Sequence, residues 1–518
     1  MKIETHKLRF PFVILSLVIY NFFFWNDKFG INLPLFTTLL LAFQLVLNPV
    51  SILSNRVRIT LAGTLLSGVM VVLFNSFSSK FAHVTSFFLT TVFIHHFELR
   101  SILYAIPTFV FDHIYVQSFL LKGLGRVSGQ SKNARKLWRY FKLIVIPAIV
   151  LGVFYVLYAI ANPKFKSLVY KLTVNFFDWV ENFIGYLSFS RIVFLLLGLF
   201  LITGAIYYSA KKFFSNVESE FDDPLVRKRL TRFKVKISNS LGESKTLPGF
   251  SHFKMNALKN ELRIAIILIT AVNVMLLVVN VVDINWVWIN FLPDPGFNLS
   301  QFVHEGTYIL IMSILLSIAI LLYFFRQNLN FYSKNKWLKI LGIIWMIQNL
   351  LLVISVALRN FHYINYHGLA YKRIGVFIFL ALTVFGIITV LIKVLKVKSA
   401  YYLFRINGWS AYIMLILMAF MNWDVIIARH NLNHKYPANI DVQFLMTLSD
   451  KTLPLMFENK MELKKEVLYY YYNDESKWLE YENELEWRKQ KFTERQSDFS
   501  FLSWNWQDQK VKKYFTAH

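Results

Sequence analysis

One stretch of the sequence gathers side chains that could do chemistry. It is RNFHYINYHGLAYKRIG, residues 359–375, which lies between two apolar runs and contains no acidic residue. Guanidinium and ammonium groups bind phosphate or carboxylate through charge-assisted hydrogen bonds, and tyrosine hydroxyls can add to such a site. The stretch therefore predicts a ligand- or anion-binding site made of Arg359, His362, Tyr363, Tyr366, His367, Tyr371, Lys372 and Arg373.

A second set of residues would suit a metal ion or a proton relay. Imidazole and carboxylate groups are common transition-metal ligands, and imidazole titrates near neutral pH. The candidates sit at the ends of apolar runs and are His304, Glu305, His362, His367 and Asp424. The HEGTY sequence at residue 304 lacks the second histidine of the zincin signature. His362 and His367 are five residues apart, so a loop would have to bring them together.

A third interpretation needs no ligand. Tyrosine, tryptophan, arginine and histidine commonly form belts at the membrane interface, where long basic side chains reach the head groups. Anion binding, metal or proton chemistry and an interfacial belt therefore remain three alternatives for these residues.

Composition places the elements that carry these residues in a membrane. The chain has 518 residues, of which 56% are hydrophobic and only 17% charged. Runs of about 20 apolar residues are long enough to cross the hydrocarbon core as helices. We expect an all-α, polytopic transmembrane helical bundle with about eleven spans. The predicted spans are residues 10–25, 32–48, 58–75, 82–97, 142–161, 191–210, 262–282, 303–325, 337–358, 374–393 and 402–421.

The distribution of Lys and Arg predicts the orientation of these spans. Basic loops stay on the cytoplasmic side, and this rule is satisfied if residues 101–121 form an interfacial helix and do not cross. The N-terminus is then inside and the C-terminus outside. The stretch 359–375 falls outside, where its positive charges are an exception to the rule. Residues 162–190 read as an amphipathic helix on the outer surface.

Few polar side chains interrupt the predicted spans. Most of them are amides, and Asn273 and Asn280 are seven residues apart and so share one helix face. Such amides usually join helices by hydrogen bonds. The spans lack the central carboxylates typical of proton-driven pumps.

The C-terminal region has a different character. The formal charge of the chain is +26, but residues 425–518 contain 14 Lys and Arg against 14 Asp and Glu. The excess lies in short loops between spans, which favours contact with anionic lipid head groups over nucleic acid. The charged periodic pattern after residue 460 predicts a small helical extramembrane domain.

These features suggest four regions along the chain. They are an N-terminal membrane region at 1–121, basic loops with two spans and an outer helix at 122–261, a membrane core at 262–424, and a helical extramembrane tail at 425–518. The sequence contains no cysteine, which excludes disulfides and thiolate sites. No kinase or serine-hydrolase motif is present, and no cofactor is predicted.

Several long strings resemble a known family. They include QFVHEGTYILIMSILLSIAILLYFF, LLVISVALRNFHYINYHGLAYKRIGVFIFL, NGWSAYIMLILMAFMNWDVIIARHNL and DVQFLMTLSDKTLPLM. They are similar to an uncharacterised bacterial integral-membrane family, common in Bacteroidota and Actinobacteria and catalogued only as a domain of unknown function. The resemblance covers residues 264–456 and the WNW string at 504–506, and it implies a multi-pass protein of the bacterial cytoplasmic membrane. It implies no activity, cofactor or site residue.

Three functional hypotheses follow. We interpret the chain as a non-enzymatic envelope sensor or assembly component that binds lipid head groups and, through residues 425–518, an envelope protein. The first alternative is a carrier or channel for a small or lipidic anion. The second is a membrane-bound, metal-dependent enzyme.

Overall fold

In the computed structural model the chain forms two compact units. The first unit comprises Met1–Arg100, Tyr104–Asn216 and Ser497–Trp506, and the second comprises Ser101–Leu103, Val217–Gln496 and Gln507–His518. The structure describes residues 4–127, 189–208, 212–227, 232–238, 244–250, 255–289, 299–326, 328–433 and 440–517, with a few single positions between 151 and 169. The predicted span 142–161, the basic loop 122–142 and the predicted outer helix 162–190 lie mostly outside these residues.

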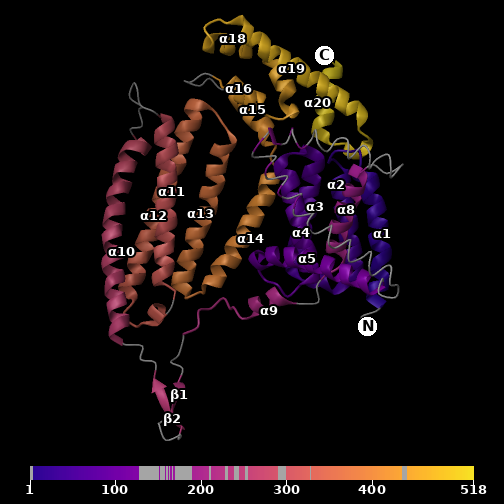
Figure 1. The fold of residues 1–518 in the computed structure, drawn as a ribbon. Helices are drawn as coiled ribbons and strands as arrows, with labels where there is room; N and C mark the ends of the chain where they lie inside the picture. The colour runs from indigo at the N-terminus through magenta and orange to yellow at the C-terminus, as the bar shows by residue number, and fades with distance from the viewer. Residues whose placement is uncertain are drawn as a thin grey trace. The chain divides into compact units, whose positions relative to one another are not determined.

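Apolar helices form the first unit (Figure 1). Their bounds are α1 Glu4–Phe24, α2 Asn32–Leu47, η1 Pro49–Leu53, α3 Asn55–Phe74, α4 Phe77–His95, α5 Ile102–Val127, α8 Phe189–Ile206 and α9 Phe213–Ser219. Helices α1 and α8 run antiparallel: Tyr20 stacks on Phe194 at 4.5 Å near one end, and Arg9 lies over Tyr208 at 4.8 Å near the other.

Buried polar side chains join α2, α3 and α4. His83 is 1% exposed, and its ring nitrogens lie 2.8 Å from the Thr37 hydroxyl and 3.0 Å from the Thr64 carbonyl oxygen. The Gln44 amide donates to the Thr91 hydroxyl at 3.3 Å. Hydrogen bonds of this kind hold apolar helices together where lipid supplies no hydrophobic drive.

Helix α5 covers the region predicted to lie at the interface. It runs crosswise to α3 and α4 in Figure 1, and its Asp112 accepts a hydrogen bond from His96 at 2.6 Å. Gln117 donates to the Thr203 hydroxyl at 2.7 Å on α8. It is not among the described helices that are long and apolar enough to span. Its placement in the membrane stays a prediction.

The second unit holds the remaining membrane helices. Their bounds are α10 Met255–Asp283, η3 Ile284–Ile289, α11 Leu299–Phe324, η4 Asn328–Phe331, α12 Lys336–His367, α13 Tyr371–Lys396 and α14 Ala400–Ala419. These helices stand side by side in Figure 1. Their buried apolar residues, including Ile269, Leu321, Trp345 and Val390, form one continuous core.

The helices have the length and composition of membrane spans. Six described helices qualify, and α1, α2 and α8 contribute shorter apolar segments. The six are Asn55–Phe74, Leu258–Ile289, Gly306–Phe324, Lys336–His367, Tyr371–Lys396 and Ala400–Ala419. The prediction of a polytopic helical membrane protein is confirmed. Helix α4, at the predicted span 82–97, is not among them; the exact span count and the orientation stay predictions.

One short hairpin was not predicted. Strands β1 Arg232–Ser238 and β2 Ser244–Phe250 pair antiparallel, with Val235 opposite Leu247. The sequence RFKVKIS alternates apolar and basic residues, which is the two-residue period of a strand. The hairpin lies within the basic loop between α9 and α10.

The segment before this hairpin is tied to the turn between α13 and α14. Glu218 accepts a hydrogen bond from the Tyr401 hydroxyl at 2.8 Å, and Asp223 accepts two from Arg405 at 3.2 and 2.5 Å. Tyr401 and Arg405 lie at the start of α14, and the charge pattern assigns this end of α14 to the same membrane face as the basic loop after α9.

A helical domain follows the last span. Its elements, which we call the C-terminal helical domain, are α15 Trp423–Asn433, α16 Val442–Met446, η5 Asp450–Thr452, α17 Leu453–Glu458, α18 Lys460–Tyr470, α19 Glu475–Asp498 and α20 Trp506–Ala517, whereas η6 Phe501–Ser503 belongs to the first unit. It has its own apolar core, which includes Leu453, Met456, Leu463 and Leu485.

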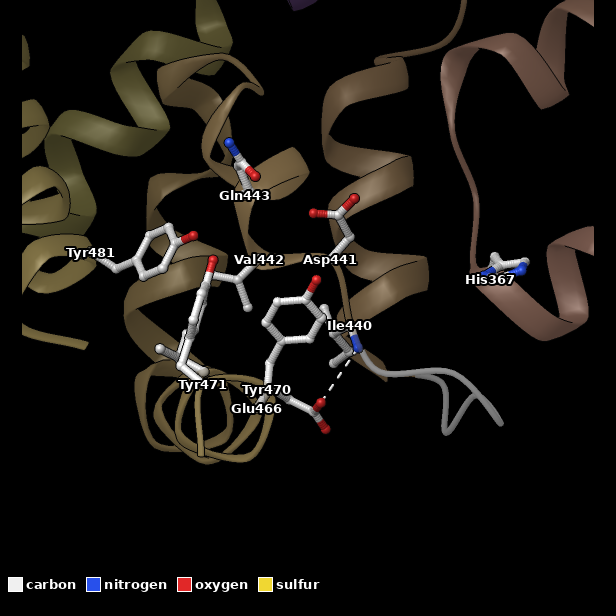
Figure 2. A pocket seen from close by; sticks show the side chains of 10 residues that line it. His367, Ile440, Asp441, Val442, Gln443, Glu466, Tyr470, Tyr471 and Tyr481 are labelled. Carbon is white, nitrogen blue, oxygen red and sulfur yellow. Dashed lines mark hydrogen bonds between the residues drawn. The ribbon is translucent and has the colours of Figure 1, made fainter. Parts of the chain in front are cut away.

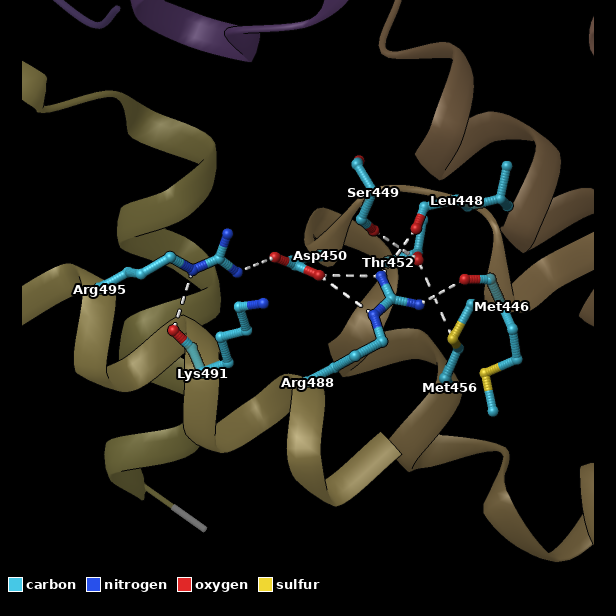
Figure 3. Close-up of polar contacts among 9 residues, drawn as sticks. All are labelled: Met446, Leu448, Ser449, Asp450, Thr452, Met456, Arg488, Lys491 and Arg495. Carbon is cyan, nitrogen blue, oxygen red and sulfur yellow. Dashed lines mark hydrogen bonds and ion pairs between the residues drawn. The ribbon is translucent and has the colours of Figure 1, made fainter. Parts of the chain in front are cut away.

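An arginine cluster fixes α19 within this domain (Figure 3). Arg488 is 8% exposed and donates to the carbonyl oxygens of Met446 at 2.8 Å and Leu448 at 2.7 Å. Asp450 accepts from Arg488 at 2.9 Å and from Arg495 at 2.7 Å. One carboxylate therefore bridges two guanidinium groups and holds the loop after α16 against α19.

Residues Ser497–Trp506, which we call the strap, belong to the first unit. Asp27, after α1, accepts hydrogen bonds from Ser500 at 2.8 Å and from Ser503 at 2.7 Å. The Ile31 backbone N–H donates to the Trp504 carbonyl at 3.0 Å. A Cβ on Gly30 would lie 2.3 Å from the Ser503 carbonyl oxygen, so this close approach requires glycine.

Gly30→Ala should therefore release the strap. The added methyl group must displace the Ser503 backbone, and overpacking of this kind costs about 1–3 kcal/mol. We expect faster hydrogen–deuterium exchange in residues 497–506, measured by mass spectrometry. Gly375→Ala is the matched control, because nothing lies within 4 Å of its Cβ position. Unchanged exchange in the Gly30→Ala strap would contradict the contact.

Candidate functional site

A polar seam between α10 and α12 leads toward the stretch 359–375. Gln348 donates to the Asn273 side-chain oxygen at 2.8 Å, and Asn273 donates to the Leu341 carbonyl at 3.1 Å. Two turns further along α10, Asn280 donates to the Gln348 carbonyl at 3.2 Å. The seven-residue repeats on both helices keep these groups facing each other, as in a parallel coiled coil.

A buried ion pair ends this seam. Arg359 on α12 contacts the Asp283 carboxylate on α10 at 2.6 Å, and their side chains are only 8% and 6% exposed. Gly306 on α11 leaves room for the guanidinium, since a Cβ there would lie 3.1 Å from Arg359 Nη1. The first cation of the predicted anion site is therefore neutralised inside the helix bundle.

The helix after Asp283 is also tied to α12. Residues Ile284–Ile289 continue α10 as a π-helix, where the sequence alone suggested the start of a loop. Trp288 donates to the Ser355 hydroxyl at 2.9 Å, and the His362 ring nitrogen lies 3.2 Å from the Val287 carbonyl oxygen. His362 thus has a backbone partner on this segment.

Arg373 closes the turn between α12 and α13. Its Nη1 donates to the carbonyl oxygens of His367, at 3.0 Å, and Gly368. The guanidinium also lies over the Tyr363 ring at 4.4 Å. Asn360 completes the closure by donating to the Arg373 carbonyl at 2.9 Å. These contacts give Arg373 and Tyr363 a structural role in the turn.

Asn431 docks the C-terminal helical domain on this turn. Its side-chain oxygen accepts from the Leu369 N–H at 2.7 Å, and its side-chain nitrogen donates to the Leu369 carbonyl at 2.9 Å. The amide thereby pairs with Leu369 as a neighbouring strand would. Gly368, with a φ of +83°, is required beside it, because a Cβ would lie 2.8 Å from the Asn431 oxygen.

Two adjoining cavities open where the domain meets the turn. The first, of about 380 Å³, is lined by His367, Ile440, Asp441, Val442, Gln443, Glu466, Val467, Tyr470, Tyr471 and Tyr481. The second, of about 340 Å³, is lined by His367, Leu369, Ala370, Tyr371, Lys372, Arg373, Asn431, Ile440, Asp441 and Phe444. His367, Ile440 and Asp441 line both cavities, so the two are neighbours.

The first cavity combines carboxylates with phenol groups (Figure 2). Asp441 caps α16 by accepting from the Phe444 N–H at 2.8 Å, and Glu466 accepts from the Ile440 N–H at 3.4 Å. Burial, with the Tyr471 hydroxyl beside it, raises the pKa of Tyr481. Its hydroxyl therefore stays protonated at neutral pH and can donate a hydrogen bond.

Basic side chains outnumber acidic ones in the second cavity, where Asp441 supplies a carboxylate. Lys372 is exposed and lies in the first turn of α13, and Arg373 and His367 lie beside it. Ala370, at the N-cap position of α13, provides no side-chain cap, and the first turn contains no acidic residue. A helix N-terminus with a lysine favours an anion, because its backbone N–H groups carry partial positive charge.

The predicted site residues are therefore distributed over two layers. Arg359, His362 and Tyr363 lie in the helix-packing layer, whereas His367, Tyr371, Lys372 and Arg373 line the second cavity. Tyr366 packs against His367, with ring centroids 4.8 Å apart.

The metal candidates lie on separate elements. His304 and Glu305 are in α11, with side chains outside the described part of the structure, and Asp424 is in the first turn of α15. Among the residues whose positions are described, no three His, Asp or Glu side chains form a group that could hold a metal ion.

Sequence reasoning missed several residues of this region. Asp283 was assigned to a loop, although its distance from Asn280 was a helical one-turn step that could have placed it on the same face. Asp441 and the Tyr470–Tyr471 pair were assigned to the tail as a whole. No sequence pattern predicted that the tail would return to the turn at Leu369, where Asn431 bonds to the backbone and Ile374 of α13 joins the apolar core of the tail.

The fold defines the class of protein as a polytopic helical membrane protein with a C-terminal helical domain. A family model described as a domain of unknown function (DUF4153) matches residues 12–459, and the chain belongs to this family. The match includes the N-terminal half, where the sequence strings were least distinctive. No curated protein and no solved structure matches the chain.

The ion pair makes a clear prediction about stability. Arg359→Met leaves Asp283 buried and unpaired, and breaking one side of a buried pair costs about 3–5 kcal/mol. Asp283→Leu should cost a similar amount, whereas the double variant should recover most of the loss, because no buried charge remains. Thermal unfolding of the purified protein in one detergent measures all three. Additive losses in the double variant would contradict the pairing.

Proposed function

We propose that this is a non-enzymatic, multi-pass protein of the bacterial cytoplasmic membrane whose C-terminal helical domain is a binding module at the outer face. The observation that carries the proposal is the docking of this domain on the α12–α13 turn through Asn431, which creates the two cavities. Their walls offer charged and aromatic groups to a ligand.

The contacts of Arg359 and His362 support a binding module over the anion carrier and the metal enzyme. An anion carrier built on Arg359 needs that guanidinium to meet its substrate, but Arg359 is paired with Asp283. A metal enzyme needs converging ligands, and His362 lies against the Val287 carbonyl. By contrast, Lys372, Asp441 and Glu466 face cavities.

The proposed side of the membrane rests on charge. Helix α12 begins at Lys336, and α13 ends with Lys393 and Lys396 in its last turn, so the ends remote from the docked domain are basic. The positive-inside rule then puts the docked domain outside.

Hydrogen–deuterium exchange of the full-length protein tests the binding module. We compare protein in discs of its native membrane with delipidated protein in detergent. We expect slower exchange in residues 440–444 and 466–471 in native membrane, because a bound molecule shields these backbone amides. This protection should be lost in Asp441→Asn/Glu466→Gln.

The two substitutions are chosen to keep the fold. Asparagine caps a helix about as well as aspartate, and glutamine retains an acceptor for the Ile440 N–H. Asp474→Asn/Glu480→Gln makes the same chemical changes at exposed positions that line neither cavity and serves as the control. Equal exchange of the native and delipidated proteins in both segments would overturn the proposal.

A further inference from the structure

We propose that the two adjoining cavities together bind one phosphoethanolamine group of a membrane phospholipid, its ammonium in the first cavity and its phosphate in the second. This inference rests on the proposed function, because it names the ligand of that binding module. It is carried by the opposite charges of two cavities that share His367, Ile440 and Asp441.

The first cavity suits a primary ammonium group. Asp441 and Glu466 make no ion pair with any residue in the described part of the chain. Tyr470, Tyr471 and Tyr481 add phenol oxygens and aromatic faces to the same wall. A primary ammonium has three hydrogen-bond donors, which these oxygens can accept, and aromatic faces attract cations.

Figure 2 shows how these groups are arranged, with the Asp441 and Glu466 carboxylates on opposite sides of the Tyr470 ring. Tyr470 and Asp441 lie next to each other, and the Tyr471 and Tyr481 hydroxyl groups approach from the opposite wall. Glu466 lies below them, where its carboxylate reaches the Ile440 N–H. Asp441 is the N-cap residue of α16, whereas Glu466 lies within α18. The two carboxylates therefore come from different segments of the domain.

The second cavity suits a phosphate group. Lys372 provides a mobile ammonium, His367 an imidazole, and α13 an uncapped helix N-terminus. Such a set binds phosphate oxygens by charge-assisted hydrogen bonds. Arg373 adds positive charge while its Nη1 remains bonded to the His367 and Gly368 carbonyls.

Connectivity favours one zwitterionic ligand over two separate ions. The shared residues Ile440 and Asp441 stand between the basic and the acidic walls, so a phosphate and an ammonium joined by two carbons can occupy both. A purely anionic head group would place its uncharged end against Asp441 and Glu466. Those carboxylates would then lose water without gaining a cation.

The position of the second cavity favours a lipid as the source. Its residues lie at the turn between two spanning helices, which is the level of the head groups. Leu369, Ala370 and Phe444 give it an apolar wall. That wall can receive the glycerol part of a phospholipid.

Binding of short-chain lipids to the full-length protein tests the inference, with native mass spectrometry as the readout. Dihexanoyl phosphatidylethanolamine should bind at least about tenfold more tightly than the phosphatidylglycerol or phosphatidylcholine analogue, since only it combines the phosphate with a primary ammonium. Asp441→Asn/Glu466→Gln should weaken its binding about tenfold. Lys372→Gln should weaken the ethanolamine and glycerol lipids alike, and Asp474→Asn/Glu480→Gln should change neither.

The other outcomes each overturn a part of the inference. Equal binding of the ethanolamine and glycerol lipids overturns the ammonium site. Free phosphoethanolamine that binds as tightly as the lipid overturns the membrane source and indicates a soluble ligand. If no defined lipid binds while the native membrane still protects residues 440–444, the head-group assignment fails and the binding module stands.

Discussion

The arrangement of the candidate site depends on one amide side chain. Asn431 satisfies both backbone groups of Leu369, at 2.7 and 2.9 Å, and thereby joins the first helix after the last span to the turn between α12 and α13. Gly368 must be a glycine for this approach, because of its positive φ and the 2.8 Å separation between its Cβ position and the Asn431 oxygen. Ile440, Asp441 and Phe444 lie at the turn in the docked domain, whose apolar core also includes Ile374 of α13.

The charges near this turn fall into two groups with different roles. Arg359 and Arg373 are bonded within the protein, the first to Asp283 and the second to two carbonyl oxygens. Lys372, Asp441 and Glu466 line cavities and remain available to a ligand. A buried charge in a membrane is stable only when it is paired, so the first group stabilises the bundle, whereas the second gives the site its chemistry.

Much of the fold could be predicted from the sequence, because about 20 apolar residues in a row leave a chain few alternatives to a membrane helix. The amides Asn273 and Gln348 were expected to join helices, and they bond to each other. The basic stretch 359–375 was recognised as a cluster. Which of its residues pack between helices and which line a cavity could not be predicted. That division depends on Asp283, 76 residues away in the sequence, and on Asp441, beyond two further helices.

The acidic residues of the site could not be predicted from the sequence for the same reason. Asp441 and Glu466 are ordinary residues of a charge-balanced tail until Asn431 positions them beside His367. The strap shows the same limit, since neither Asp27 nor Ser500 belongs to a recognisable motif, yet they bond across 473 residues of sequence. Contacts made by single polar side chains leave no periodic pattern to read.

We propose that docking through Asn431 builds a lipid-binding site. Native mass spectrometry of wild-type protein and Asn431→Ala, both extracted gently from the same membranes, tests it most directly. The wild-type protein should carry a stoichiometric amine-bearing phospholipid that is lost from the variant, while the far-ultraviolet circular dichroism of the two proteins stays the same. The same adduct on both proteins would contradict the claim, because the lipid would then bind without the docked domain.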